Sequence, residues 1–146
     1  MELKLYLKSL EGDTKTPITL FRNYVGKEKG FLLESRDEGK GRYSFIAKNP
    51  FGELQGKGKE IIIKEGCKVI KKQGNIMDAV REYMSQFTIK NHSSIPFIGG
   101  GVGTVGYDIV REFEKLPNPN KDTIQVPDVH LMFAREMIAY DHYHQQ

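Results

Sequence analysis

Tryptophan is absent from the 146 residues of this chain, and cysteine occurs once, at Cys67. A single cysteine excludes an internal disulfide, and this cysteine usage suits a reducing cytoplasm. No apolar run is long enough to cross a bilayer. The N-terminal stretch MELKLYLKSLEGD carries a charge at every second or third residue, which is not typical of a signal peptide. We therefore expect a cytoplasmic protein with no membrane partner.

The chain also lacks a large excess of charge of one sign. The chain has 22 Lys and Arg against 19 Asp and Glu, a net charge of +3. The two signs are interleaved in stretches such as RDEGKGR and REFEKLP, whereas nucleic-acid binding usually leaves a stripe of one sign. We therefore expect no nucleic-acid partner. Hydrophobic residues make up 38% of the chain, which suits one globular domain over residues 1–146.

Hydrophobic periodicity predicts more strands than helices. A helix is expected after Thr16 as its cap, with Pro17 in the first position and Gly26 at its end, and a second one after Asn75. The remaining patterns predict strands at residues 2–9, 30–35, 42–48, 51–72, 95–108 and 128–144, with a hairpin turn at Glu65-Gly66. Because strands and helices do not alternate, the expected class is α+β, with mostly antiparallel β-sheets packed as a sandwich-like core and a few short helices.

The stretch FIGGGVGTVGYDIV contains the letters G-x-G-x-x-G, which also occur in dinucleotide-binding loops. That fingerprint needs a full helix after the glycines and an acidic residue that closes a second parallel strand. Here Pro117 and Pro119 end the helical pattern early, and Asp128 opens a strand instead. We therefore expect the glycines to allow close packing of a strand, with no cofactor in this chain.

The segment DHYH places His142 and His144 on one face of a strand, a spacing that can bind metal, with His130 and Asp141 as further candidates. We favour the simpler interpretation, a polar strand end, and expect no metal site. Cys67 lies among lysines in the predicted hairpin, and we interpret it as a structural or incidental thiol.

Four segments together resemble the N-terminal region of anthranilate synthase component I, a family that uses chorismate. They are TPITLF, FLLESRDEGKGRYSFIAKNPF, FIGGGVGTVGYDIVREFEKLP and VPDVHLMFAREMIAYDH, and they span essentially the whole chain in the family's order. The resemblance implies a contribution to tryptophan biosynthesis, with a glutamine amidotransferase subunit (component II) as partner. It also implies that the glycine-rich segment is a structural strand.

In the family, catalysis and Mg²⁺ binding belong to a C-terminal chorismate-binding domain. None of that domain's motifs is present here, so we expect this chain to be catalytically inactive alone and to pair with its own catalytic domain. Two alternatives stay open. One is the sibling aminodeoxychorismate synthase component I of the folate pathway, and the other is a free-standing domain that binds a small ligand or nucleic acid.

The resemblance further implies that this region helps to bind the feedback inhibitor L-tryptophan. Ser35 matches the family's inhibitor-contacting serine, and Glu34 is a candidate for the ligand's amino group. The remaining candidates are three positions that wall the pocket, an arginine that would offset Glu34 or meet a carboxylate, and a proline near the indole: Tyr43, Ser44, Phe45, Arg42 and Pro17. Without the family, Tyr43 and Phe45 alternate with Ser44, so either set could face the core.

Overall fold

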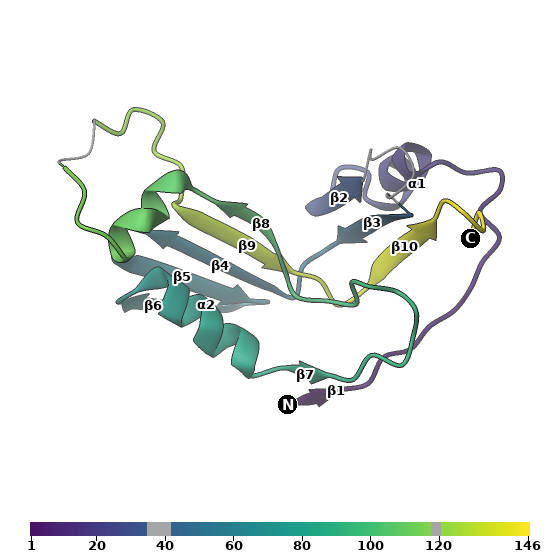
Figure 1. Ribbon diagram of the computed structural model, residues 1–146, viewed down its shortest axis with the longest axis horizontal. Coiled ribbons are helices and arrows are strands. Elements are labelled where there is room, and N and C mark those ends of the chain that lie inside the picture. The colour runs from purple at the N-terminus through teal and green to yellow at the C-terminus, as the bar shows by residue number, and fades with distance from the viewer. Residues whose placement is uncertain (35–41, 118–120) are drawn as a thin grey trace. The chain divides into compact units, whose positions relative to one another are not determined.

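The computed structural model describes residues 1–34, 42–117 and 121–146. The chain forms two compact units, and each is built from segments that are distant in sequence (Figure 1). Unit 1 comprises Met1–Pro50, Thr88–Gly100 and Ala134–Gln146, and unit 2 comprises Phe51–Phe87 and Gly101–Phe133.

Unit 1 contains a three-stranded antiparallel sheet in the order β10-β3-β2. Its strands are β2 (Gly30–Glu34), β3 (Tyr43–Lys48) and β10 (Met137–Asp141), and helix α1 (Pro17–Tyr24) packs on β3 and β2. Two short strands, β1 (Glu2–Leu3) and β7 (Thr88–Ile89), pair in parallel. The central strand β3 is the best-buried part of the unit, because Ile46 and Ala47 have no exposed surface.

Local signals in the sequence place helix α1 correctly. Thr16 is the N-cap, and its side-chain oxygen accepts a hydrogen bond from the Thr19 backbone N–H at 3.2 Å. Pro17 fills the first helical position, where its missing N–H costs nothing. Gly26 follows the helix in the left-handed region, with φ at 59°, which L side chains rarely adopt. The predicted start and end of this helix are confirmed.

Unit 2 contains a five-stranded antiparallel sheet in the order β6-β5-β4-β9-β8. The strands are β4 (Gly52–Lys57), β5 (Glu60–Glu65), β6 (Lys68–Gln73), β8 (Gly101–Val105) and β9 (Val129–Phe133). Helix α2 (Ile76–Ser85) lies along this sheet, and η1 (Tyr107–Glu112), a short 3-10 helix, follows β8 (Figure 1).

The core of unit 2 lies between α2 and the sheet. It consists of ten buried side chains: Leu54, Ile61, Ile63, Ile76, Ala79, Val80, Tyr83, Val129, Leu131 and Phe133. Asn75 caps α2 as predicted, since its side chain accepts from the Asp78 backbone N–H at 2.9 Å. The N-terminal end of α2 is also held by Glu112 of η1, whose carboxylate accepts from the Ile76 N–H at 2.8 Å.

The predicted class is confirmed: the fold is α+β, with antiparallel sheets and few short helices. Inside each unit the layer that packs on the large sheet is a helix, so the sandwich-like packing of sheet on sheet stays a prediction. No helix in the described ranges is long and apolar enough to cross a membrane.

Three of the local predictions were wrong. The strand expected at residues 2–9 is reduced to Glu2–Leu3, because an alternating segment forms a strand only where it finds a partner edge, and Tyr6 is 85% exposed. The strand expected at 128–144 is two strands, β9 and β10, which belong to different sheets. The hairpin turn lies one residue later, at Gly66-Cys67, since Glu65 already pairs with Lys68.

The glycine-rich segment contains a strand, but a shorter one than the predicted residues 95–108. Gly101–Val105 form β8, which runs antiparallel to β9 with Gly103 opposite Leu131, and η1 begins at Tyr107. A Cβ placed on Gly101 would lie 3.0 Å from the Phe133 ring, and one placed on Gly103 would meet the backbone of β9. Close packing therefore explains these glycines, and that part of the prediction is confirmed.

Candidate functional site

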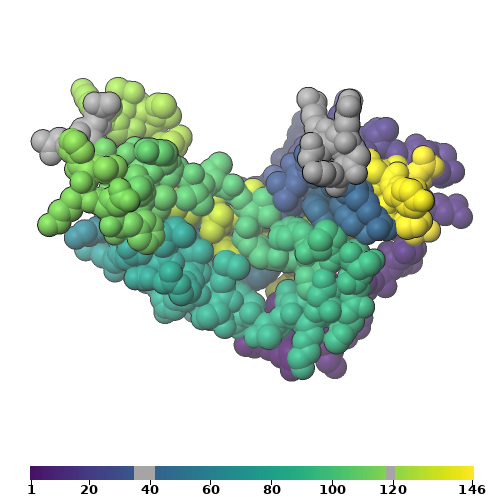
Figure 2. All heavy atoms as spheres, in the orientation of Figure 1, coloured from purple at the N-terminus to yellow at the C-terminus, as the bar shows by residue number. Residues whose placement is uncertain are grey.

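The candidate residues of unit 1 gather where the three strands of its sheet end or begin. Glu34 closes β2 and lies opposite Ser44, while Arg42 immediately precedes β3. Asp141 closes β10 and lies opposite Tyr43. In Figure 2 the C-terminal residues, coloured yellow, lie directly beside the blue residues of β3. Antiparallel pairing therefore brings together residues from opposite ends of the chain.

Arg42 and Asp141 form the strongest polar contact at this end of the sheet. The Arg42 guanidinium donates from Nη2 to Oδ2 at 2.6 Å and from Nε to Oδ1 and Oδ2 at 3.2 and 3.1 Å. The Asp141 side chain is only 12% exposed, and such two-pronged, charge-assisted pairs are among the stronger hydrogen bonds in proteins. The resemblance implies that Arg42 offsets Glu34 or meets a carboxylate, and in the structure it binds the carboxylate of Asp141.

Several donors stabilise the charged form of Asp141. The Arg42 hydrogen bond is the main reason why the pKa of this carboxyl lies well below its usual range, and contacts from His144 and Tyr143 act in the same direction. Burial opposes this shift, because it disfavours a charge, but it is the weaker effect. Asp141 therefore remains a carboxylate in mildly acidic solution.

This depressed pKa predicts an acid-sensitive contribution to stability. Because the folded pKa of Asp141 lies below the unfolded one, the stabilisation is fully present above the unfolded value of about 3.9. It is lost as the pH falls through the folded pKa, so the free energy of unfolding should begin to drop below about pH 5. Chemical denaturation at stepped pH should show a shallower acid decline for Asp141→Asn than for wild type. Parallel curves for the two proteins would contradict the prediction.

Three aromatic rings form a row on one face of β3. Tyr43 stacks on Phe45 with ring centroids 6.0 Å apart, and Phe45 meets Phe97 edge-on at 5.4 Å. The Arg42 guanidinium carbon lies 4.9 Å from the centre of the Tyr43 ring, within cation–π range. This row, Tyr43–Phe45–Phe97 with Arg42 at one end, is called the aromatic row below. It offers an apolar surface of half-buried rings, with Phe97 standing edge-on to Phe45.

Ser44 lies on the opposite face of β3, because neighbouring residues of a strand point to opposite sides. It has no exposed surface, and its hydroxyl lies 2.8 Å from His142 Nε2. Tyr140, which lies opposite Ser44, is also buried, and its hydroxyl donates to the backbone carbonyl of Lys15 at 3.1 Å. Pro17 is buried at the start of α1. The candidates therefore divide between a buried face and the face that carries the aromatic row.

Of the remaining two candidates, Glu34 and Ser35, the structure describes only Glu34. Glu34 is exposed at the end of β2, opposite Ser44. Ser35, the position that matches the family's serine, lies outside the described residues.

Sequence reasoning missed Phe97 and did not connect Asp141 and His142 with this site. The sequence pattern of Asp141 and His142 predicts only a polar strand end or a pair of metal ligands. Arg42 and Asp141 are 99 positions apart in the chain, and no periodicity or spacing rule links residues at that distance. Only the register between β3 and β10 brings them together.

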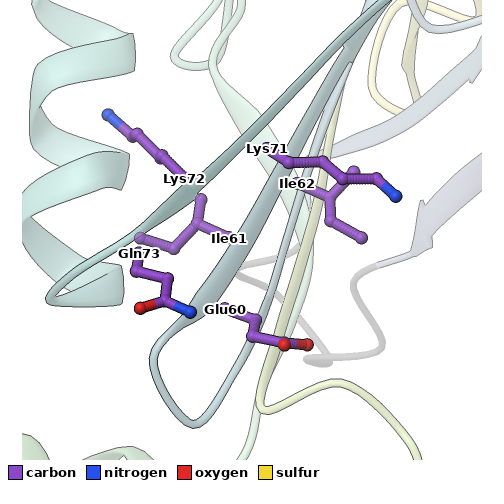
Figure 3. Close-up of a pocket in the computed structure, with 6 residues that line it drawn as sticks. All are labelled: Glu60, Ile61, Ile62, Lys71, Lys72 and Gln73. Carbon is purple, nitrogen blue, oxygen red and sulfur yellow. The ribbon is translucent and has the colours of Figure 1, made fainter.

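Outside this end of the unit 1 sheet, the described residues form no better candidate for a binding site. Across the described ranges, no three or more His, Cys, Asp and Glu side chains gather in a way that could hold a metal ion. A shallow depression on the β5–β6 hairpin is lined by Glu60, Ile61, Ile62, Lys71, Lys72 and Gln73 (Figure 3). Figure 3 shows Lys72 and Lys71 extending in opposite directions from this hairpin. None of the predicted site residues lines it.

Known proteins resemble the chain in both sequence and fold. No protein-family model matches it. Anthranilate synthase component 1 of Acetivibrio thermocellus is 38% identical over 138 residues, which is 92% of this chain and 28% of that protein. The same protein of Acinetobacter calcoaceticus is 32% identical over 145 residues and is likewise covered to 28%.

The solved structure of anthranilate synthase component I from Streptococcus pneumoniae TIGR4 matches 97% of the chain with a TM-score of 0.60 and 27% identity. This chain covers 30% of that structure, so it spans less than a third of the proteins that it matches. The resemblance that the four sequence segments indicated is confirmed: this chain is related in sequence and fold to a part of anthranilate synthase component I.

Proposed function

We propose that this chain is the N-terminal regulatory and structural part of anthranilate synthase component I, which converts chorismate, with ammonia or glutamine, to anthranilate in tryptophan biosynthesis. The observation that carries the proposal is the match over 92% of the chain to a relative of that name. The relatives reported above carry the anthranilate name, which favours this branch over aminodeoxychorismate synthase. The proposed setting is the cytoplasm.

In this proposal the end of the unit 1 sheet contributes to a feedback site for L-tryptophan. An indole needs an apolar surface, and an ammonium group needs acceptors. The aromatic row offers the first, and the exposed carboxylate of Glu34 offers the second. Ser35 is proposed as a direct contact. The buried residues Ser44 and Pro17 would act indirectly, by fixing β3 and the start of α1.

The reaction itself is assigned to the part of the relatives that this chain does not span. Chorismate binding, Mg²⁺ binding and the contact with the glutamine amidotransferase, component II, are proposed for the complete enzyme. The 146-residue chain alone is therefore expected to be inactive. Supplied with chorismate, ammonia and Mg²⁺, it should form no fluorescent anthranilate above the rate without protein. Sustained anthranilate formation that scales with chain concentration would contradict this assignment.

A titration tests the proposed ligand site directly. The chain has 7 tyrosines and no tryptophan, so added L-tryptophan is the sole indole fluorophore in the sample. Its emission anisotropy, excited at the red edge where tyrosine absorbs little, should rise to a plateau as protein is added. Phenylalanine should fail to displace it, and Ser35→Ala should weaken binding by about tenfold, the loss of one good hydrogen bond. Anisotropy that stays at its free value at every chain concentration would contradict a tryptophan site in this chain.

A further inference from the structure

The charge on Arg42 is already neutralised within unit 1. Its guanidinium donates to Asp141 through both Nε and Nη2, and the shortest of these contacts is 2.6 Å. A carboxylate of a bound amino acid would have to compete with this pair. The geometry therefore assigns Arg42 a different task from the expected one, which is to meet a ligand carboxylate or to offset Glu34.

That task follows from the position of the guanidinium. Its central carbon lies 4.9 Å from the centre of the Tyr43 ring, so Arg42 makes a cation–π contact at one end of the aromatic row. Tyr43 in turn stacks on Phe45, and Phe45 contacts Phe97. If the Arg42 side chain moved, Tyr43 would lose this cation–π contact and keep only its stacking on Phe45. The position of Arg42 therefore restrains the Tyr43 end of the row.

Asp141 holds it. The carboxylate is itself fixed, because Oδ1 accepts from the backbone N–H of Tyr143 at 2.9 Å and from that of His144 at 3.2 Å. The β10–β3 ladder also continues to this point, since the His142 N–H donates to the carbonyl of Arg42 at 2.8 Å. The guanidinium itself is held by the Asp141 carboxylate, and its Nη2 also lies 3.0 Å from His144 Nδ1.

We infer that Asp141 is a positioning residue of the proposed tryptophan site, and that it acts by holding the Arg42 guanidinium over Tyr43 and so fixing the aromatic row that receives the indole. The inference rests on the proposed function, which supplies the ligand. Asp141 itself makes no contact with the ligand in this scheme. Its effect on affinity should pass entirely through Arg42.

Asp141→Asn separates this role from a purely structural one. The asparagine oxygen can still accept from the Tyr143 and His144 backbone N–H groups, so the turn after β10 is kept. Its amide group carries no charge and cannot reproduce the two-pronged contact with Arg42. The matched control is Asp108→Asn, because Asp108 also pairs with an arginine, accepting from Arg111 Nε at 2.9 Å, but lies in unit 2.

The experiment is a double-mutant cycle read by L-tryptophan fluorescence anisotropy. Asp141→Asn and Arg42→Gln should each weaken binding by about tenfold, and Asp108→Asn should leave it unchanged. Because Asp141 acts through Arg42, the double variant should bind no more weakly than Arg42→Gln alone, within about twofold. Wild-type affinity in Asp141→Asn, or losses that multiply in the double variant, would overturn the inference while leaving the proposed function intact.

A second readout needs no ligand. In ¹H–¹⁵N NMR spectra the Arg42 Nε–H should exchange slowly with water in the wild type and rapidly in Asp141→Asn, with shifted ring signals from Tyr43 and Phe45. Backbone signals of β3 and β10 should stay in place, which shows that the sheet is intact. An unprotected Arg42 Nε–H in the wild type would overturn the inference. A wild-type chain that shows this protection but binds no tryptophan would contradict the proposed function and not the role of Asp141 in holding Arg42.

Discussion

Gly103→Ala is expected to destabilise unit 2 by about 3 kcal/mol, at the upper end of what overpacking costs. A Cβ at this position would lie 1.8 Å from the carbonyl oxygen of His130 and 3.1 Å from the Leu131 Cα. Both neighbours belong to the backbone of β9, so neither can rotate away as a flexible side chain would. Relief requires β8 to move off β9, which breaks the pairing of Gly103 with Leu131.

The measurement is the free energy of unfolding from urea titration, with Thr104→Ala as the control. Thr104 is the next residue of β8 and is exposed, so its truncation should change stability by less than about 0.5 kcal/mol. If Gly103→Ala were as mild as the control, the glycine could not be explained by close approach of the two strands. The purpose of the glycine-rich stretch would then have to be sought elsewhere.

Leu54→Ala should cost about 3 kcal/mol, the usual range for a large-to-small change at a buried site being about 2 to 5. Leu54 lies on the central strand β4 and has no exposed surface. Its direct neighbours across the sheet are Ile63 on β5 and Leu131 on β9, both of which belong to the core of unit 2. The shortened side chain leaves a cavity. Because β4 is hydrogen-bonded to β5 on one side and β9 on the other, the backbone cannot shift to close it.

The matched control for this variant is Val69→Ala on the edge strand β6. Val69 is 53% exposed, so its truncation removes little buried surface and should cost less than about 1 kcal/mol. Urea midpoints of the two variants should therefore separate clearly. Equal midpoints would mean that the core described for unit 2 does not carry the stability of the sheet.

Sequence rules succeeded where a structure is decided by neighbouring residues. Thr16, Pro17 and Asn75 mark the starts of both α-helices because caps and first-turn positions are read from a few consecutive residues. The same rules failed for residues 2–9, whose alternation is real but whose partner strand is missing beyond Glu2–Leu3. The same rules predicted one strand where the structure has β9 and β10. No local signal in the sequence shows that the chain passes from one sheet to another between them.

The candidate site shows the same division. The alternation of Tyr43, Ser44 and Phe45 was visible in the sequence, but which face is buried was not. Which face of β3 is buried depends on residues that are distant in sequence, such as those of α1, which packs on this strand. In the structure the face of Ser44 is the buried one, since Ser44 has no exposed surface. The pairing of Arg42 with Asp141 depends on strand register across 99 positions, so charge patterns alone could not predict it.

A segment exchange tests the central proposal most directly. The stretch of the Acetivibrio thermocellus relative that matches this chain, 28% of that enzyme, is replaced with the present sequence, and anthranilate formation is measured with and without L-tryptophan. If this chain is the N-terminal part of such an enzyme, the folded chimera should form anthranilate at a rate within about tenfold of the parent and be inhibited by tryptophan. A chimera that folds and binds chorismate but forms no anthranilate would contradict the proposal.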